Sequence, residues 1–273
     1  MQRDSIDFSS SDVGKLFRRF LFPTVMGMVF SAVFVITDGI FVGRGIGSDA
    51  LVSVNIVAPL FTLGTGLGLM FGMGGSVVAS INLAQDKRRV AEINITQSLA
   101  LPALLIALLS ALLIHCHEPL LMLLDTPGEL MVPAREYLVW FTLFLAPLAV
   151  FNILMFIVRL DGAPGFAMAC NIMAACINIA LDYLFIFVFE WGLAGAAVAT
   201  GIGYVVGSGV MLWYMFRRSR TLRFVKLKMS GKSMRLTVRN LWYMSYIGFP
   251  ALLSELAISC LMIVGNYTFI HYV

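Results

Sequence analysis

The sequence predicts an all-α, polytopic helical membrane protein, and three observations lead to that fold class. Hydrophobic residues make up 60% of its 273 positions and charged residues only 12%, whereas soluble domains carry about a quarter charged residues. The apolar residues are collected in long runs, and the basic residues are concentrated between those runs. A chain of this composition belongs in a bilayer.

Seven apolar runs are expected to cross the membrane, since most are long enough for about 30 Å of hydrocarbon at ~1.5 Å per residue. Basic loops follow the second, fourth and sixth runs, at residues 83–92, 159–164 and 217–241. The second run is longer than a span requires and is expected to bend near Pro59. The spans are predicted at 20–42, 51–82, 93–115, 133–158, 165–190, 192–216 and 242–271.

These spans imply an organisation in four parts. Residues 1–19 form a cytoplasmic N-terminal segment, which is polar and lacks the apolar core of a signal peptide. Residues 20–216 form a six-helix lobe, and 217–241 form a basic cytoplasmic linker. Residues 242–273 are expected to be the first helix of an incomplete second lobe.

Lysine and arginine give the orientation. Of the 19 Lys and Arg residues, only Arg44 and Arg135 fall on one side of the predicted spans. Because cytoplasmic loops are enriched in basic residues, the N-terminus is predicted to be cytoplasmic. The protein is expected in a cell membrane, with the membrane lipids among its partners. The same topogenic role explains the basic linker, so nucleic-acid binding is not needed.

Three acids lie inside predicted spans: Asp38, Asp182 and Glu255. Asp38 lies ~28 Å along its helix from Arg19, and Asp182 lies ~27 Å along its helix from Pro164. Both are therefore expected at one level in the outer part of the membrane. Thr200, on the returning sixth span, is expected at the same depth.

Asp182 also lies on a polar helix face. Asn178 precedes it by four residues and Asn171 by eleven, spacings that put all three side chains on one side of a helix. Such a face must be turned toward protein or a water-filled cavity. A carboxylate there, without a basic neighbour, is expected to bind a proton, Na⁺ or a cationic substrate reversibly. The alternative is that such an acid is only a solvated residue at the membrane interface, and this alternative is strongest for Asp38.

Two other motifs point to ordinary structure. The segment "HCHE" at 115–118 is better explained as an interfacial loop than as a metal site. The glycine-rich segment 64–76 is expected to serve close helix packing, with bending during transport as the alternative. We find no nucleophile with its base, so an enzyme is not predicted, and neither is a cofactor or resident metal.

The seventh span, "MSYIGFPALLSELAIS", is similar to the first, "FRRFLFPTVMGMVFSA", in placing Pro250 and Pro23 soon after the entry. This suggests a second repeat, cut off within its first helix. The segments "FPTVMGMVFSAVFVITDGIFVGRGIGSDALVSVNIVAPL", "GLGLMFGMGGSVVASINLAQDKRRVAE" and "RLDGAPGFAMACNIMAACINIALDYLFIFVFEWGLAGAAVAT" resemble the multidrug and toxic compound extrusion (MATE) family of transporters.

The resemblance implies two six-helix lobes that export small cationic or amphipathic compounds in exchange for H⁺ or Na⁺. It also implies that this chain is a fragment whose C-terminal lobe is missing. The family's coupling residues fall on Asp38, Asn178, Asp182 and Thr200, with Pro23 at a bend of the first helix.

Three further residues are weaker candidates for the same site. Asn152 is a candidate because of its position on the fourth span, and Asn171 because it lies on the polar face of the fifth. Glu255 is expected to face the cavity from the second lobe. Phe34 and Met155 depart from the pattern, since some members have tyrosine and asparagine there.

Two alternatives stay open. A related lipid-linked oligosaccharide flippase would be expected to line its cavity with arginines for a pyrophosphate, and no span interior here contains one. The other alternative is a non-functional fragment or assembly partner. The substrate, and the choice between H⁺ and Na⁺, cannot be read from these residues.

Overall fold

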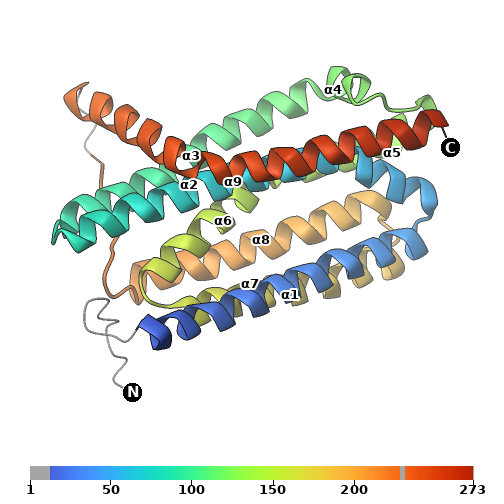
Figure 1. The fold of residues 1–273 in the computed structure, drawn as a ribbon. Coiled ribbons are helices and arrows are strands. Elements are labelled where there is room, and N and C mark those ends of the chain that lie inside the picture. The colour runs from blue at the N-terminus through green and yellow to red at the C-terminus, as the bar shows by residue number, and fades with distance from the viewer. Residues whose placement is uncertain (1–12, 228–230, 273) are drawn as a thin grey trace.

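The computed structural model describes residues 13–227 and 231–272, and over these residues it is built from helices that run side by side (Figure 1). The expected segment 1–19 lies outside the described residues as far as position 12, as do linker residues 228–230. The helix that follows the linker begins at Gly231, earlier than the expected residue 242. The all-α, polytopic fold class predicted from the sequence is confirmed.

Among the described residues, six helices are long and apolar enough to cross a membrane, and a bent pair makes a seventh span. The seven spans correspond one by one to those predicted. The single helices are α1 (Val13–Gly45), α2 (Ser48–Ala84), α3 (Arg88–His115), α7 (Pro164–Asp182) with the π-helix η2 (Tyr183–Val188), α8 (Gly192–Arg217) and α9 (Gly231–Tyr272). The bent pair joins η1 (Gly128–Leu130) and α5 (Met131–Leu143) to α6 (Leu145–Leu160), and the short α4 (His117–Leu123) precedes it.

The fourth span is the one that breaks into two helices. Between α5 and α6 the direction changes by 46° at Phe144. Pro147 explains the break, because it has no N–H to donate to the carbonyl of Leu143 and is tolerated only in the first turn of a helix. The sequence analysis overlooked this proline in favour of Pro59.

The second span continues as one helix through Pro59. The missing N–H of this proline leaves the carbonyl of Asn55 without its helical donor. Asn266 of α9 supplies one, since its Nδ2 lies 2.9 Å from that oxygen. The neighbouring helix therefore supplies the donor that Pro59 lacks, and a bend of α2 near this proline stays a prediction.

Close helix packing is the role of the glycine-rich segment, as predicted. A Cβ added at Gly68 would lie 2.9 Å from Cβ of Asn152 on α6. On the other side, a Cβ at Gly74 would overlap the carbonyl oxygen of Met244, and one at Gly248 would overlap that of Met70. The backbones of α2 and α9 thus touch at a crossing where only glycine fits.

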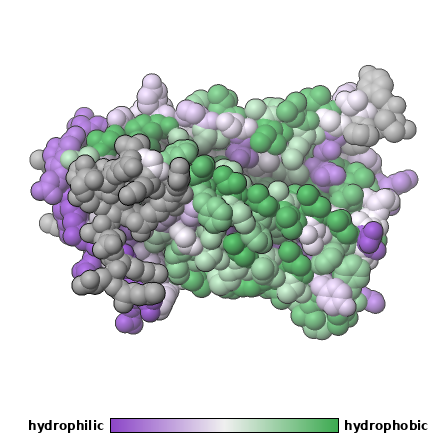
Figure 2. Space-filling model, turned by 60° about the horizontal axis from the view of Figure 1, so that its bottom comes forward, coloured by the Kyte–Doolittle hydropathy of each residue, from purple (hydrophilic) through white to green (hydrophobic). Residues whose placement is uncertain are grey.

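The surface is apolar along the middle of the molecule. In Figure 2, hydrophobic residues cover the central band and hydrophilic residues gather toward one end. Large side chains such as Val35, Leu108 and Leu261 are more than half exposed, with exposed fractions of 59%, 60% and 74%. In water such a surface would be unstable, so these side chains are suited to lipid.

Candidate cation-binding site

The residues predicted to couple transport to an ion come from three helices that pack together. Asp38 lies on α1, Asn178 and Asp182 lie on α7, and Thr200 lies on α8. Asp182 is fully buried, with an exposed fraction of 0%, and Asn178 and Thr200 are buried at 2% and 7%. Asn178 donates from Nδ2 to the Thr200 hydroxyl oxygen over 3.0 Å.

The carboxyl groups of Asp38 and Asp182 lie within electrostatic range of each other. Two ionised carboxylates that interact repel one another, so a proton or cation bound between them is favoured. Among the described residues, neither acid forms an ion pair with lysine or arginine. The pair is therefore not neutralised by a fixed side chain, as the sequence analysis had required.

Four buried oxygen atoms at this site have no hydrogen-bond partner among the described residues. They are Oδ1 of Asp38, Oδ1 of Asn178 and both carboxyl oxygens of Asp182. An unsatisfied acceptor in an apolar environment costs free energy. Carboxylate and amide oxygens are also the ligands that hard cations prefer, so a proton or Na⁺ would satisfy them.

A cavity of about 220 Å³ adjoins this site between α1, α2, α6, α7 and α8. The polar face predicted on α7 lines it, since Asn171 and Asn178 are both in its wall. Thr200 lies in the same wall, whereas Asp38 and Asp182 do not. The acids therefore lie outside the cavity wall, in which Asn178 and Thr200 are hydrogen-bonded to each other.

The weaker candidates have their own partners. Asn171 donates to the carbonyl of Gly27 and to the Ser31 hydroxyl, both at 3.0 Å, which ties α7 to α1. Asn152 lines the cavity and donates to the carbonyl of Leu148 at 3.1 Å. Neither asparagine amide is thus left open toward the acids.

Glu255 and Pro23 are not at this site. Glu255 lies on α9 against Gly66 of α2 and does not line the cavity. Pro23 lies within α1, which runs as one helix through it, and borders a separate pocket with Pro164. A coupling role for Glu255 and a functional bend at Pro23 stay predictions.

Two tyrosines were missed from the sequence. The hydroxyl of Tyr137 on α5 lies within electrostatic range of both Asp38 and Asp182, and that of Tyr204 on α8 lies within range of Asp38. Tyr204 follows Thr200 by one helical turn, so the face containing Thr200 could have revealed it. Tyr137 has no such signal, because the break at Phe144 determines where α5 points.

The profile of the MatE family matches residues 23–184, which is more than half of the chain. This chain belongs to the MATE family. The resemblance stated from the sequence is therefore confirmed, and members of this family are membrane transport proteins rather than enzymes.

Relatives of this MATE chain extend beyond the region it covers. It is 30% identical over 267 residues to the Multidrug export protein MepA of Staphylococcus saprophyticus, covering 95% of this chain and 56% of the relative. It is 28% identical over 274 residues to MepA of Staphylococcus aureus (strain MRSA252), covering 97% and 58%. The chain thus spans little more than half the length of these relatives.

Solved MATE structures have the same fold. An outward-facing conformation of a multidrug resistance MATE family transporter matches with a TM-score of 0.81 at 25% identity, over 92% of this chain and 55% of that one. An inward-facing conformation matches with a TM-score of 0.74 at 25% identity, over 84% and 51%. The fold thus agrees with the outward-facing arrangement over more of its length.

Two residues of this MATE chain depart from the expected pattern. Phe34 is in the cavity wall, where its ring offers no hydroxyl to Asp38. Met155 is buried in the apolar core, with an exposed fraction of 7%. Hydroxyl groups near the acids come instead from Thr200, Tyr137 and Tyr204.

Proposed function

We propose that this chain is the ion-coupling part of a secondary active exporter. The exporter would move small cationic or amphipathic compounds out across the plasma or inner membrane by antiport with H⁺ or Na⁺. The observation that carries the proposal is the neighbouring pair Asp38–Asp182. Neither acid forms an ion pair with lysine or arginine among the described residues, and Oδ1 of Asp38 and both oxygens of Asp182 have no hydrogen-bond partner there. The names of the MepA relatives support multidrug export.

In this mechanism an entering H⁺ or Na⁺ neutralises the acid pair. The loss of repulsion between the two carboxylates lets α1 approach α7 and α8, and that change alters the affinity for a cationic compound in the adjoining cavity. A membrane potential of ~100 mV contributes ~2.3 kcal/mol for each charge moved across the membrane. The orientation with a cytoplasmic N-terminus places the acids toward the outer surface, where the entering ion is available.

Residues 20–216 would form the N-terminal lobe in this proposal, and 242–273 would begin a second lobe. A complete cavity for a compound requires that second lobe, so the partner of this chain is a C-terminal lobe of the kind found in its longer relatives. A non-functional fragment is the competing reading. Co-expression with such a lobe would separate the two, since only a functional half would gain efflux.

A lipid-linked oligosaccharide flippase fits the cavity less well. A pyrophosphate needs basic side chains, and none of the residues that line the described cavity is lysine or arginine. The asparagine and threonine side chains of the wall are neutral, which suits an amphipathic compound or cation instead.

Dye efflux from membrane vesicles tests the proposal. The protein with both lobes would be assayed while the H⁺ gradient and the Na⁺ gradient are collapsed in turn. We expect efflux to stop when one of the two gradients is collapsed, and that gradient identifies the coupling ion. Asp182→Asn should remove the dependence on that gradient, whereas the exposed Asp49→Asn should not. Undiminished, gradient-dependent efflux by Asp182→Asn would refute the coupling role.

A further inference from the structure

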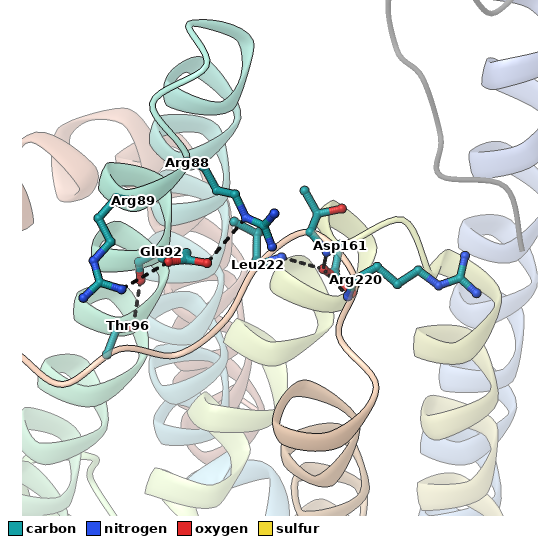
Figure 3. Close-up of polar contacts among 8 residues, drawn as sticks. Arg88, Arg89, Glu92, Thr96, Asp161, Arg220 and Leu222 are labelled. Carbon is teal, nitrogen blue, oxygen red and sulfur yellow. Dashed lines mark hydrogen bonds and ion pairs between the residues drawn. The ribbon is translucent and has the colours of Figure 1, made fainter.

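The segment that leaves α8, residues 218–227, is fastened to the helical body by Asp161. This acid lies just after α6, is buried with an exposed fraction of 2%, and accepts hydrogen bonds from the backbone (Figure 3). The donors are the N–H of Arg220 at 3.0 Å, and those of Thr221 and Leu222 at 2.8 and 2.9 Å. The start of the linker is thereby held against the end of α6.

Thr96 fastens the same segment a second time. The N–H of Val225 donates to Oγ1 of Thr96 over 3.1 Å. This Oγ1 itself donates to the carbonyl of Glu92 over 2.7 Å (Figure 3). The linker therefore crosses the first turns of α3 at a position fixed by the contact between Val225 and Thr96. Between the two fastenings it carries Arg223 over α3.

A pocket of about 630 Å³ lies between this segment and α3. Its wall consists of Arg88, Arg89, Glu92, Arg223, Phe224 and Val225. Within this wall, three guanidinium groups face a single carboxylate, so the pocket has an excess of positive charge. Its remaining side chains, from Phe224 and Val225, are apolar.

The guanidinium groups remain available to a ligand. Nε of Arg88 and Nη1 of Arg89 share Glu92, at 3.6 and 3.5 Å from its oxygens, and the two arginine side chains are still 53% and 72% exposed. Arg223 is exposed and forms no ion pair with another described residue. A planar guanidinium matches the oxygens of a phosphate group, with two parallel hydrogen bonds to each.

The pocket lies where the apolar span of α3 begins. Arg88 is the first residue of that span, and Val90 beside it is 42% exposed. A ligand here would have its charged group among the arginines and its apolar part against Val90, Phe224 and the lipid-facing side of α3. This combination fits an amphiphile better than a free anion.

We propose that this pocket binds the phosphate headgroup of an anionic phospholipid. The lipid bridges Arg88 and Arg89 on α3 to Arg223 on the linker. Topogenic charge alone needs no such geometry, since it acts through loop composition. Here the fastenings at Asp161 and Thr96 fix the position of Arg223. The inference does not depend on the transported compound or on the coupling ion.

Native mass spectrometry of the purified protein tests this site, with phosphatidylglycerol and phosphatidylcholine as probes. We expect preferential retention of phosphatidylglycerol, and Arg223→Gln should weaken it about fivefold, as expected for one basic side chain at an anionic surface. The exposed Arg44→Gln, at the opposite end of the spans, should have no effect. Equal retention of both lipids, or an equal loss with both variants, would overturn the proposal.

Thr96→Val separates a built site from general charge attraction. The variant keeps every charge and nearly the same shape, but it removes the acceptor for the N–H of Val225. We expect phosphatidylglycerol retention to fall by about the same factor as for Arg223→Gln. Retention equal to the parent protein would show that only charge is sensed, and the defined pocket would be rejected.

Inorganic phosphate distinguishes a lipid from a soluble ligand. When it is added in excess over phosphatidylglycerol, we expect the lipid to remain bound, because its apolar part also contacts the protein. Complete displacement of the lipid would mean that the pocket takes a free phosphate, and the lipid assignment would be withdrawn.

Discussion

Asp161 and Asp182 are the two most deeply buried acids of the described residues, with exposed fractions of 2% and 0%, yet their surroundings are opposite. Asp161 accepts hydrogen bonds from three backbone N–H groups and from the hydroxyl of Tyr214 at 2.9 Å. Both oxygens of Asp182 lack a hydrogen-bond partner among those residues. Burial alone therefore does not distinguish the two acids, whereas the number of fixed donors does.

The difference explains what each acid does for the protein. The donors to Asp161 are fixed parts of the folded chain, so the hydrogen bonds of this acid hold the linker to α6. The charge of Asp182 has no such fixed donors among the described residues, which is why we propose that a proton or cation completes its site. One carboxylate holds two segments together, and the other is the proposed ion site.

The largest expected effect is that of Asp182→Asn on ion-driven efflux. Without a second carboxylate the site cannot change charge with the ion, so efflux should fall to the level without a gradient. The free energy of unfolding should change by no more than ~1 kcal/mol, because no hydrogen bond to a fixed donor is lost. Efflux in vesicles and thermal unfolding in detergent measure the two quantities. A large loss of stability would place Asp182 in the same class as Asp161.

Asp161→Ala should have the reverse effect. Removing the carboxylate leaves three backbone N–H groups without their acceptor, at a cost of about 3 kcal/mol or more in the free energy of unfolding. Thermal unfolding measures this loss, and Asp161→Asn, which keeps one acceptor oxygen, should lose less. Full stability of Asp161→Ala would contradict the fastening of the linker.

Thr200→Val should weaken the ion site without unfolding it. The hydroxyl of Thr200 accepts the hydrogen bond that orients Asn178 toward the acids. Its loss should raise the ion concentration for half-maximal efflux about fivefold, the value of one hydrogen bond. Thr142→Val is a matched control, since its buried hydroxyl has no partner among the described residues. A similar shift in both variants would rule out an orienting role.

The smallest expected effects come from one substitution made twice on α8. Tyr204→Phe removes a hydroxyl near Asp38 and should shift the half-maximal ion concentration by roughly twofold, with stability unchanged. Tyr214→Phe removes a donor to Asp161 and should lower the free energy of unfolding by about 1 kcal/mol, with the ion response unchanged. If the two variants changed the same quantity, the distinction between the acids would fail.

The spans and the common depth of the candidate acids could be predicted because both depend on regular helices. The depth of Asp38, Asp182 and Thr200 follows from the rise per residue, and the structure brings these side chains together. Tyr137 could not be found, because its position depends on the break at Phe144. Asp161 was also overlooked, since its donors are backbone groups that leave no pattern in the residues around it.

The glycine crossing of α2 and α9 has a mechanical consequence. Where Gly74 and Gly248 meet the opposite backbone, no side chains interdigitate. Rotation of one helix about the other at this point would therefore not be opposed by interlocking side chains. Resistance would come from hydrogen bonds on either side of the crossing. The amide of Asn240 donates to Asn94 at 2.8 Å and to Gln97 at 2.6 Å, and that of Asn266 donates to the carbonyl of Asn55 at 2.9 Å.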